Sequence, residues 1–263
     1  ELHSNEGDRR SSVLCSKGIC TDIGPMVVTT LVDITPLAII TARLQDFTYV
    51  ASHDLQEPLR TITSFLGLLK KRCGTELSKQ AILYIDTAMG ASSRMGDLIT
   101  DLLAYTRLDS KPNPFEWVSL STAITMALKN LSGKLTLVDC PTIIYDPSLS
   151  VEVWGDRVQL ITCLQNMLSN AIKFSNGAPI DITYTDTSTH WEVCIIDHGI
   201  GVPEGMEEAI FKPFKRVHSG YEGTGMGLPI VERVANMHNG RAWVTPTPGG
   251  GCTIHITIGK PTV

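Results

Sequence analysis

The pair His53–Asp54 combines residue types that can do chemistry at neutral pH. An imidazole can act as a nucleophile, and a carboxylate beside it can orient the ring and accept its proton. Apolar residues around the pair recur at spacings of three, four and seven, which predicts a packed helix with His53 roughly opposite its apolar stripe. That stripe consists of Leu44, Thr48, Ala51, Leu55, Ile62, Leu66 and Leu69. His53 therefore faces solvent or a partner, and an ordinary surface histidine is the alternative.

A second polar set lies in the segment NMLSNAIKF, where Asn166, Asn170 and Lys173 are four and three residues apart. This spacing places all three on one face of a helix. Amide oxygens are hard ligands that suit Mg²⁺, and a lysine supplies positive charge for a phosphate. The alternative is a polar helix face over an apolar core.

Two glycine-rich segments follow. In IIDHGIGVP, Asp197 ends a predicted strand, and Gly199 and Gly201 come after it. The carboxylate can accept a hydrogen bond from an exocyclic amine, and the glycines let the backbone approach a ring closely. In EGTGMGLPI, three glycines precede a predicted helix, whose first N–H groups can bind an anion. These are Gly223, Gly225 and Gly227.

Each segment alone is a weak signal, but their order and spacing make a strong one. An Asn/Lys helix, a DxGxG strand end, an FKPF segment and a GxGxGL helix start fall within 65 residues. Together they resemble the N, G1, F and G2 boxes of the GHKL ATP-binding fold. With ASHDLQEPL upstream, residues 40–260 resemble a HisKA-type sensor histidine kinase of the phytochrome-like, PAS-linked branch.

The resemblance implies ATP-dependent phosphorylation of a histidine, followed by phosphoryl transfer to an aspartate of a response-regulator receiver domain. His53 is the expected phosphoacceptor, and Asp54 is the expected base. Pro58 is expected to loosen the helix just beyond them, since proline lacks a backbone donor.

The resemblance also implies roles in the second half of the chain. Asn170 would coordinate Mg²⁺, Asn166 and Lys173 would steady the phosphates of ATP, and Asp197 would bind adenine N6. Close approach and lid closure would fall to the glycines, and lid anchoring to two phenylalanines. These residues are Gly199, Gly201, Gly223, Gly225, Gly227, Phe211 and Phe214. His198 and Met226 depart from the usual Asn and Leu or Ile, but neither change removes a ligand.

Long helices must position the histidine. Residues 36–72 and 79–109 predict two helices separated by the break CGTELS, which together form a helical hairpin. A hairpin has two apolar stripes to bury, so we expect a homodimer in which two hairpins form a four-helix bundle. We assign residues 37–110 to this dimerisation and phosphotransfer hairpin. Residues 1–36 contain two β-rich runs joined by TDIGP and are expected to end a PAS-like sensor domain.

Residues 115–263 predict an α+β ATP-binding sandwich that follows a linker, SKPNPFEW. Its helices are expected on one face of a mixed sheet. Predicted helices cover residues 120–131, 157–174 and 227–240, and predicted strands cover 141–146, 151–156, 180–186, 190–197, 241–246 and 252–259. The fold class of the whole chain is therefore multidomain.

Composition narrows the class further. The 263 residues are 43% hydrophobic, which suffices for packed cores, and a net charge of −5 argues against nucleic acid as a partner. No apolar run approaches the ~20 residues of a membrane span, so any membrane attachment is expected outside this stretch. A cytoplasmic location is expected from the odd, scattered set of cysteines. The chain lacks an initiator Met, so we expect a fragment of a larger protein.

The cysteine pattern indicates reduced thiols. Seven cysteines are scattered without a CxxC pair, and the seven histidines do not cluster with them along the sequence. We therefore expect neither disulfides nor a structural zinc site.

Two other functions compete with a histidine kinase. A GHKL ATPase of the chaperone, topoisomerase or mismatch-repair type would hydrolyse ATP without needing an exposed His-Asp pair on a hairpin. A catalytically inactive dimeric scaffold would bind no nucleotide. An acid-labile phosphohistidine distinguishes the kinase from both.

Overall fold

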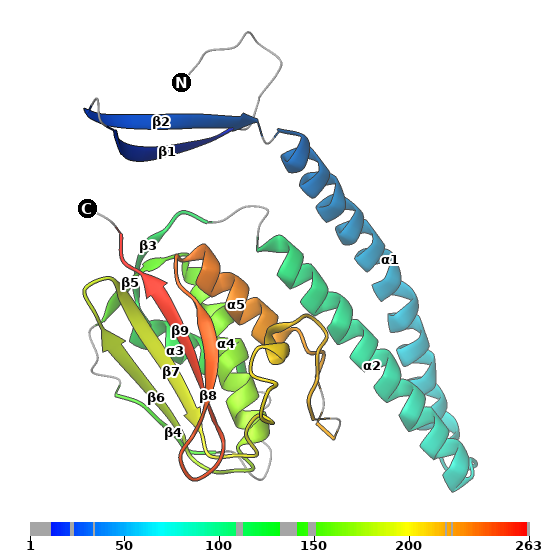
Figure 1. The fold of residues 1–263 in the computed structure, drawn as a ribbon. Helices are drawn as coiled ribbons and strands as arrows, with labels where there is room; N and C mark the ends of the chain where they lie inside the picture. The colour runs from blue at the N-terminus through cyan, green and yellow to red at the C-terminus, as the bar shows by residue number, and fades with distance from the viewer. Residues whose placement is uncertain are drawn as a thin grey trace. The chain divides into compact units, whose positions relative to one another are not determined.

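A computed structural model of the protein describes residues 12–21, 24–33, 35–108, 113–131, 141–146, 151–218, 220–221 and 223–261. The chain divides into two compact units, residues 1–54 and 55–263, and each is described by itself. Figure 1 shows their elements as a ribbon. The division falls inside the helix predicted for residues 36–72 rather than at its start.

The first unit begins with a β-hairpin. Strands β1 (Ser12–Thr21) and β2 (Gly24–Asp33) pair antiparallel along their whole length. This confirms the two predicted β-rich runs, whereas their assignment to a PAS-like domain stays a prediction. The backbone N–H of Thr35 then donates to Asp33 Oδ1 at 2.9 Å, where helix α1 (Thr35–Cys73) begins.

The two long helices begin and end close to the predicted positions. Helix α1 continues through Pro58 without a break. A Cβ on Gly74 would lie 2.3 Å from the carbonyl oxygen of Lys70, so a glycine is needed where the helix stops. Helix α2 (Lys79–Arg107) starts at Ser78, whose side chain accepts a hydrogen bond from the N–H of Ala81.

The apolar face of the hairpin is only partly covered within one chain. Ile85 and Ile99 of α2 are 8% and 7% exposed. In the second unit, however, α1 leaves several large apolar side chains in solvent. They are Leu55, Ile62, Phe65, Leu68 and Leu69, with exposed fractions of 53%, 48%, 68%, 46% and 42%. A single chain therefore leaves much of this face unpacked.

The C-terminal domain, residues 113–261, contains a five-stranded mixed sheet in the order β4-β6-β7-β9-β8. Strand β4 runs parallel to β6, and the other neighbours are antiparallel. The strands are β4 (Ile143–Ile144), β6 (Ile180–Asp186), β7 (His190–Asp197), β8 (Ala242–Pro246) and β9 (Cys252–Gly259). The helices are α3 (Leu120–Leu131), α4 (Arg157–Phe174), α5 (Gly227–Met237) and the short 3-10 helix η1 (Ala209–Phe211).

The prediction that SKPNPFEW is a linker is wrong for the second half of this segment. Glu116 to Ser119 form strand β3, which pairs antiparallel with β5 (Glu152–Gly155) as a separate two-stranded sheet. Phe115 stacks on the ring of His238 with 4.8 Å between ring centres. Asn113 donates from its backbone N–H to Asp156 Oδ2 at 2.9 Å. These contacts dock the segment onto the C-terminal domain because its aromatic and amide groups find buried partners there.

Helices α3, α4 and α5 cover one face of the large sheet, as predicted (Figure 1). Alternate residues of β7 are buried against them, among them Val193 and Ile195. The other residues of β7, such as Glu192 and Cys194, lie on the opposite face, since successive strand side chains point to opposite sides. The core therefore lies on the helix side of the sheet only.

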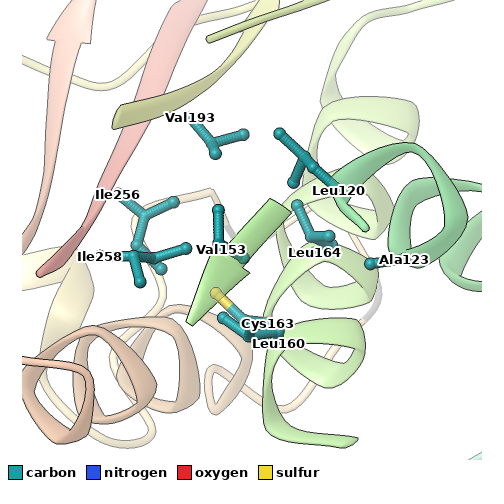
Figure 2. Close-up of a pocket in the computed structure, with 9 residues that line it drawn as sticks. All are labelled: Leu120, Ala123, Val153, Leu160, Cys163, Leu164, Val193, Ile256 and Ile258. Carbon is teal, nitrogen blue, oxygen red and sulfur yellow. The ribbon is translucent and has the colours of Figure 1, made fainter. Parts of the chain in front are cut away.

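A small apolar cavity of about 10 Å³ lies in this core. Figure 2 shows its lining, which comes from α3, α4, β5, β7 and β9. A cavity of this size without polar partners does not hold an ordered water. It is a packing gap and is not the candidate site.

Within the described ranges, no helix is long and apolar enough to cross a membrane.

Candidate functional site

Helix α4 carries the polar residues singled out by the sequence, and Asp156 fixes where it begins. This buried carboxylate accepts hydrogen bonds at Oδ1 from the N–H groups of Val158 and Gln159, at 2.9 and 3.2 Å. Such a cap satisfies donors that the first helical turn leaves without partners. Met167 and Leu168 are 0% exposed, so the helix is locked with its apolar face in the core.

Asn166 and Asn170 lie on the face of α4 that meets the start of α5. Asn166 Nδ2 donates to the carbonyl oxygen of Thr162 at 2.8 Å, which leaves Oδ1 directed at Gly227. A Cβ on Gly227 would lie 3.1 Å from Asn166 Oδ1 and 3.5 Å from Asn170 Nδ2. The two amides thus border a space that a side chain would fill. Asn166 presents its oxygen there and Asn170 its Nδ2, and an amide oxygen suits a hard cation such as Mg²⁺.

Lys173 lies one turn further along the same helix. Its Nζ is 4.4 Å from the centre of the Phe174 ring, and a Cβ on Gly223 would lie 2.9 Å from it. The glycine therefore lets the ammonium group reach the glycine-rich loop. This juxtaposition brings a positive charge to the backbone that precedes α5.

Asp197 lies at the end of β7 and is only 2% exposed. Its Oδ1 accepts hydrogen bonds from the N–H groups of Gly199 (3.0 Å) and Cys252 (3.3 Å). The thiol of Cys252 donates to Oδ2 at 3.0 Å, and burial raises the pKa of that thiol far above its usual range. Sequence reasoning missed Cys252, because nothing in its own neighbourhood along the chain points to Asp197.

Gly199 supports this carboxylate in a different way from the one predicted. A Cβ at this position would lie 1.8 Å from the carbonyl oxygen of Phe174, at the end of α4. No other residue fits, so the glycine brings the backbone against α4. Gly199 therefore positions Asp197 and does not itself line the cavity described below.

The segment between η1 and α5 is the region that the resemblance predicts to act as a lid. Phe211 is buried, 6% exposed, whereas Phe214 is 52% exposed and has a positive φ of 62°. The backbone N–H of Phe214 donates to the carbonyl oxygen of Gly225 at 3.1 Å, and Gly225 itself has a φ of 76°. The buried ring of Phe211 and the backbone hydrogen bond of Phe214 thus both hold the start of the segment in place.

Three aromatic side chains that the sequence analysis did not single out gather over the end of α4. Tyr221 and His218 lie 5.0 and 5.9 Å from Phe174, measured between ring centres. His218 Nε2 is 3.0 Å from the carbonyl oxygen of Gly201, and Tyr221 donates to Asn176 Oδ1 at 3.1 Å. Aromatic residues in a short polar segment are the only signal that could have indicated them.

One large open cavity joins these parts. Among the predicted residues it is lined by Asn166, Asn170, Lys173, Asp197, Gly201, Gly223, Gly225 and Gly227. Cys252, Phe174, His218 and Tyr221 also line it, whereas Phe211 and Phe214 do not. The cavity therefore combines a buried carboxylate, amides, a lysine and the N-terminus of α5, a set that suits a purine at one end and phosphates at the other.

The end of α2 closes one side of the cavity. Thr224, within the glycine-rich loop, donates its hydroxyl to Asp101 Oδ2. Arg233 of α5 donates to the hydroxyl of Tyr105 at 3.2 Å, and its guanidinium lies 4.9 Å from the centre of that ring. The loop that precedes α5 is thus tied to the hairpin in this structure.

His53 and Asp54 are exposed on α1, as predicted, with side-chain exposures of 69% and 71%. His53 Nδ1 lies 3.2 Å from Asp54 Oδ1. When Nδ1 carries the proton it donates to Asp54, and the lone pair of Nε2 remains available for attack.

Two families match the chain. Residues 43–111 match "His Kinase A (phospho-acceptor) domain", and residues 155–262 match "Histidine kinase-, DNA gyrase B-, and HSP90-like ATPase". The first match covers the exposed His-Asp pair and the hairpin. The second covers α4, Asp197 and the glycine-rich loop.

Known proteins resemble both parts together. Cyanobacterial phytochrome A of Nostoc sp. is 37% identical over 221 residues, which is 82% of this chain and 28% of that protein. The methanogenesis regulatory histidine kinase FilI of Methanothrix harundinacea is 30% identical over 225 residues, 84% of this chain and 25% of that protein. The chain thus spans about a quarter of the length of these curated relatives.

Among solved structures, the crystal structure of full-length ShkA in complex with AMPPNP matches with a TM-score of 0.61 and 19% identity. The match covers 83% of this chain and 46% of that one. At this identity the likeness concerns the fold: a helical region followed by an α/β domain with a mixed sheet.

Proposed function

Since the chain belongs to the histidine kinases that join a HisKA domain to a GHKL ATP-binding domain, we propose that it is the core of a sensor histidine kinase. It transfers the γ-phosphoryl group of ATP to His53 and passes it on to an aspartate of a receiver domain. The observation that carries the proposal is the exposed His53–Asp54 pair, whose ring nitrogen and carboxylate lie 3.2 Å apart.

The transfer step follows from that geometry. His53 Nε2 attacks the γ-phosphorus, so an N–P bond forms while the bond from phosphorus to the bridging oxygen breaks and ADP leaves. Asp54 Oδ1 holds the Nδ1 proton and stabilises the positive charge that develops on the ring, then takes that proton or passes it to solvent. The exposure of the pair supports this role, because the acceptor must meet both ATP and a receiver domain.

The cavity of the C-terminal domain supports ATP as the phosphoryl donor. Asp197 would accept a hydrogen bond from the adenine amine, and the N–H groups at the start of α5 would bind phosphate oxygens. Lys173, beside Gly223, would add positive charge there. Gly201 and Gly225 have φ angles of 69° and 76°, a conformation that favours glycine. Both positions therefore present backbone without a side chain at the cavity wall.

Mg²⁺ is the proposed metal. Asn170 would bind it through its amide oxygen, with Asn166 beside it, and the bound ion would neutralise charge on the β- and γ-phosphates. The donor chemistry of the two amides at Gly227 supports this assignment.

A homodimer is the proposed assembly, and the exposed stripe of α1 supports it. Leu55, Ile62, Phe65 and Leu69 are seven, three and four residues apart and 42–68% exposed. This is the spacing of a helix-packing seam, and a second copy of the hairpin offers the same apolar face. The receiver domain would approach the dimer at His53, in the cytoplasm where ATP is available.

Incubation of the full chain with γ-labelled ATP and Mg²⁺ tests the proposal. We expect a protein-bound label that is lost in acid and retained in base. His53→Gln should abolish the label without changing nucleotide affinity, and His190→Gln is the matched control that should keep it. ATP hydrolysis without a bound label would instead favour a non-kinase ATPase, and absence of nucleotide binding would favour an inactive scaffold.

A further inference from the structure

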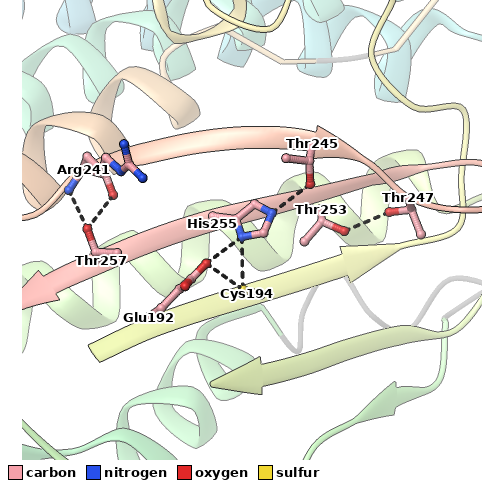
Figure 3. Close-up of polar contacts among 8 residues, drawn as sticks. All are labelled: Glu192, Cys194, Arg241, Thr245, Thr247, Thr253, His255 and Thr257. Atoms are coloured by element: carbon pink, nitrogen blue, oxygen red, sulfur yellow. Dashed lines mark hydrogen bonds and ion pairs between the residues drawn. The ribbon is translucent and has the colours of Figure 1, made fainter. Parts of the chain in front are cut away.

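The face of the sheet turned away from the helices holds a polar cluster that the nucleotide chemistry does not use. Cys194 of β7 and His255 of β9 stand directly opposite each other in the antiparallel register. Glu192, two residues before Cys194, points to the same face. Figure 3 shows the three side chains meeting between the two strands.

The possible ligand atoms of the three residues lie within hydrogen-bond distance of one another. His255 Nδ1 lies 2.9 Å from Glu192 Oε1 and 3.2 Å from Cys194 Sγ, and Sγ lies 3.6 Å from Glu192 Oε1. Tetrahedral zinc with ordinary bond lengths requires about 3.4–3.6 Å between such ligand atoms. Each separation is thus within about half an ångström of what one ion needs, so side-chain adjustment without backbone movement suffices.

We propose that Glu192, Cys194 and His255 bind one Zn²⁺ ion, with water as the fourth ligand. A thiolate, an imidazole and a carboxylate form a donor set that favours zinc over the oxygen-seeking Mg²⁺ and Ca²⁺. Within the described part of the chain, this is the one group of three such residues with their ligand atoms close together. The proposal does not depend on kinase activity, since Asp197 and the nucleotide cavity lie on the helix side of the sheet.

The surroundings prepare His255 for this role. Its Nε2 lies 2.8 Å from Thr245 Oγ1. With zinc bound, Nε2–H would donate to this hydroxyl, and the lone pair of Nδ1 would bind the metal in place of the Nδ1–H contact with Glu192. The ring also stacks on Trp243 with 4.8 Å between ring centres and 6° between planes. The side chains of His255 and Glu192 are 16% and 23% exposed, which shields the site yet leaves solvent access for a fourth ligand.

An ion pair between His255 and Glu192 is the competing explanation, but it does not require a sulfur atom at 3.2 Å from the same ring nitrogen. Zinc is bound by the thiolate form of cysteine, so metal binding would displace the Cys194 thiol proton to solvent. Replacing the sulfur consequently separates the two explanations.

The test uses the full chain after chelator treatment, with Zn²⁺ affinity measured by competition with a chromophoric chelator. We expect one tightly bound equivalent, and at least about tenfold weaker binding in Cys194→Ser, His255→Gln and Glu192→Gln. Cys73→Ser, at the end of α1, is the matched control and should bind as the wild type does. Unchanged affinity in Cys194→Ser, or no tight equivalent in the wild type, would overturn the proposal.

Cobalt provides a readout that does not depend on the stability of a variant. Co²⁺ added to the wild-type chain should give a sulfur-to-cobalt charge-transfer band and the intense visible bands of tetrahedral coordination. The band should be lost in His255→Gln and Cys194→Ser. In Thr245→Val it should persist with an affinity about 10–100-fold lower, because Thr245 only orients the imidazole. A cobalt spectrum without a sulfur band in the wild type contradicts the site.

Discussion

Leu168 of α4 and Phe65 of α1 are both apolar residues of amphipathic helices, yet the first is 0% exposed and the second is 68% exposed. The contrast extends to the regions around them. The C-terminal domain closes a core between its sheet and three helices, and Val231, Val234 and Ala235 of α5 are also 0% exposed. The hairpin buries Ile85 and Ile99 but leaves a seam of α1 in water.

This contrast in burial matches the different roles proposed for the two regions. A domain with a complete core holds a buried carboxylate such as Asp197 in one geometry, which selective nucleotide binding requires. The uncovered stripe of the hairpin suits the proposed pairing with a second copy, and the exposure of His53 suits its proposed role as an acceptor that meets ATP and a receiver domain. Substitutions in the two regions should therefore fail in different assays.

The largest effect is expected from Phe65→Glu in the hairpin. Burying one Phe contributes about 1.5–3 kcal/mol, and a symmetric dimer loses it twice, so the dimer should dissociate about 10²–10⁴-fold more readily. Sedimentation equilibrium measures this. Met126→Glu, at a 42% exposed position of α3, is the matched control and should leave the mass unchanged. A Phe65→Glu protein that sediments like the wild type would remove the seam from the interface.

Asp54→Asn should slow labelling of His53 by about 10²–10⁴-fold, the usual consequence of losing a general base. Nucleotide affinity should not change, because the carboxylate lies in the hairpin helix and not in the C-terminal domain. The initial rate with γ-labelled ATP measures it. Asp86→Asn, which removes a surface pair with Lys70, is the control. Near-normal labelling in Asp54→Asn would reduce this residue to a solvated neighbour.

Asp197→Asn should weaken ATP binding by about 1.5–3 kcal/mol, because the amide is no longer a charged acceptor for the adenine amine. Calorimetric titration with a non-hydrolysable ATP analogue measures the loss, and circular dichroism checks the fold. The control is Asp186→Asn, whose side chain pairs with Lys260 at the far end of the neighbouring strand. Equal affinities for the two variants would contradict the adenine assignment.

The smallest effect concerns pH and His238, which is 1% exposed. Its Nδ1–H donates to the carbonyl oxygen of Val234 at 2.8 Å, and its Nε2 accepts from the N–H of Asp156 at 3.0 Å. Burial lowers the pKa of His238 below 6.5, against the opposing influence of Val234 and Asp156. The unfolded chain therefore binds more protons, and the free energy of unfolding rises with pH across this window.

The free energy of unfolding should accordingly reach its full value above pH ~6.5. Below that pH it should fall by at most about 1.4 kcal/mol per pH unit for one proton. Urea unfolding of the C-terminal domain between pH 7.5 and 5 measures this change in the free energy of unfolding. His238→Asn should be less stable overall but less sensitive to pH. If both proteins lose stability equally over this range, another group is responsible.

Most elements could be predicted from the sequence because their signals are local. Helix α4 matches the predicted residues 157–174, since an Asp cap precedes it and its apolar residues repeat at helical spacing. Strand β3 was missed because four residues next to two prolines carry too little pattern, and its stability comes from pairing with β5. The spacing of Asn166, Asn170 and Lys173 sufficed to place them on one face, because helix geometry alone decides it.

Contacts between strands could not be predicted in this way. The sequence did not bring Cys194 and His255 together, since they are far apart along the chain. The antiparallel register of β7 and β9 places them opposite each other, and a shift of one residue would put them on different faces. The thiol of Cys252 reaches Asp197 for the same kind of reason.

The order of elements, the helix faces and the family could be inferred from residue types and short-range periodicity. Three features could not: which apolar stripe remains uncovered, how Gly199 packs under the end of α4, and which polar side chains meet on the open face of the sheet. Those outcomes depend on strand register and on close packing between distant segments, and neither is encoded in any single stretch of the chain.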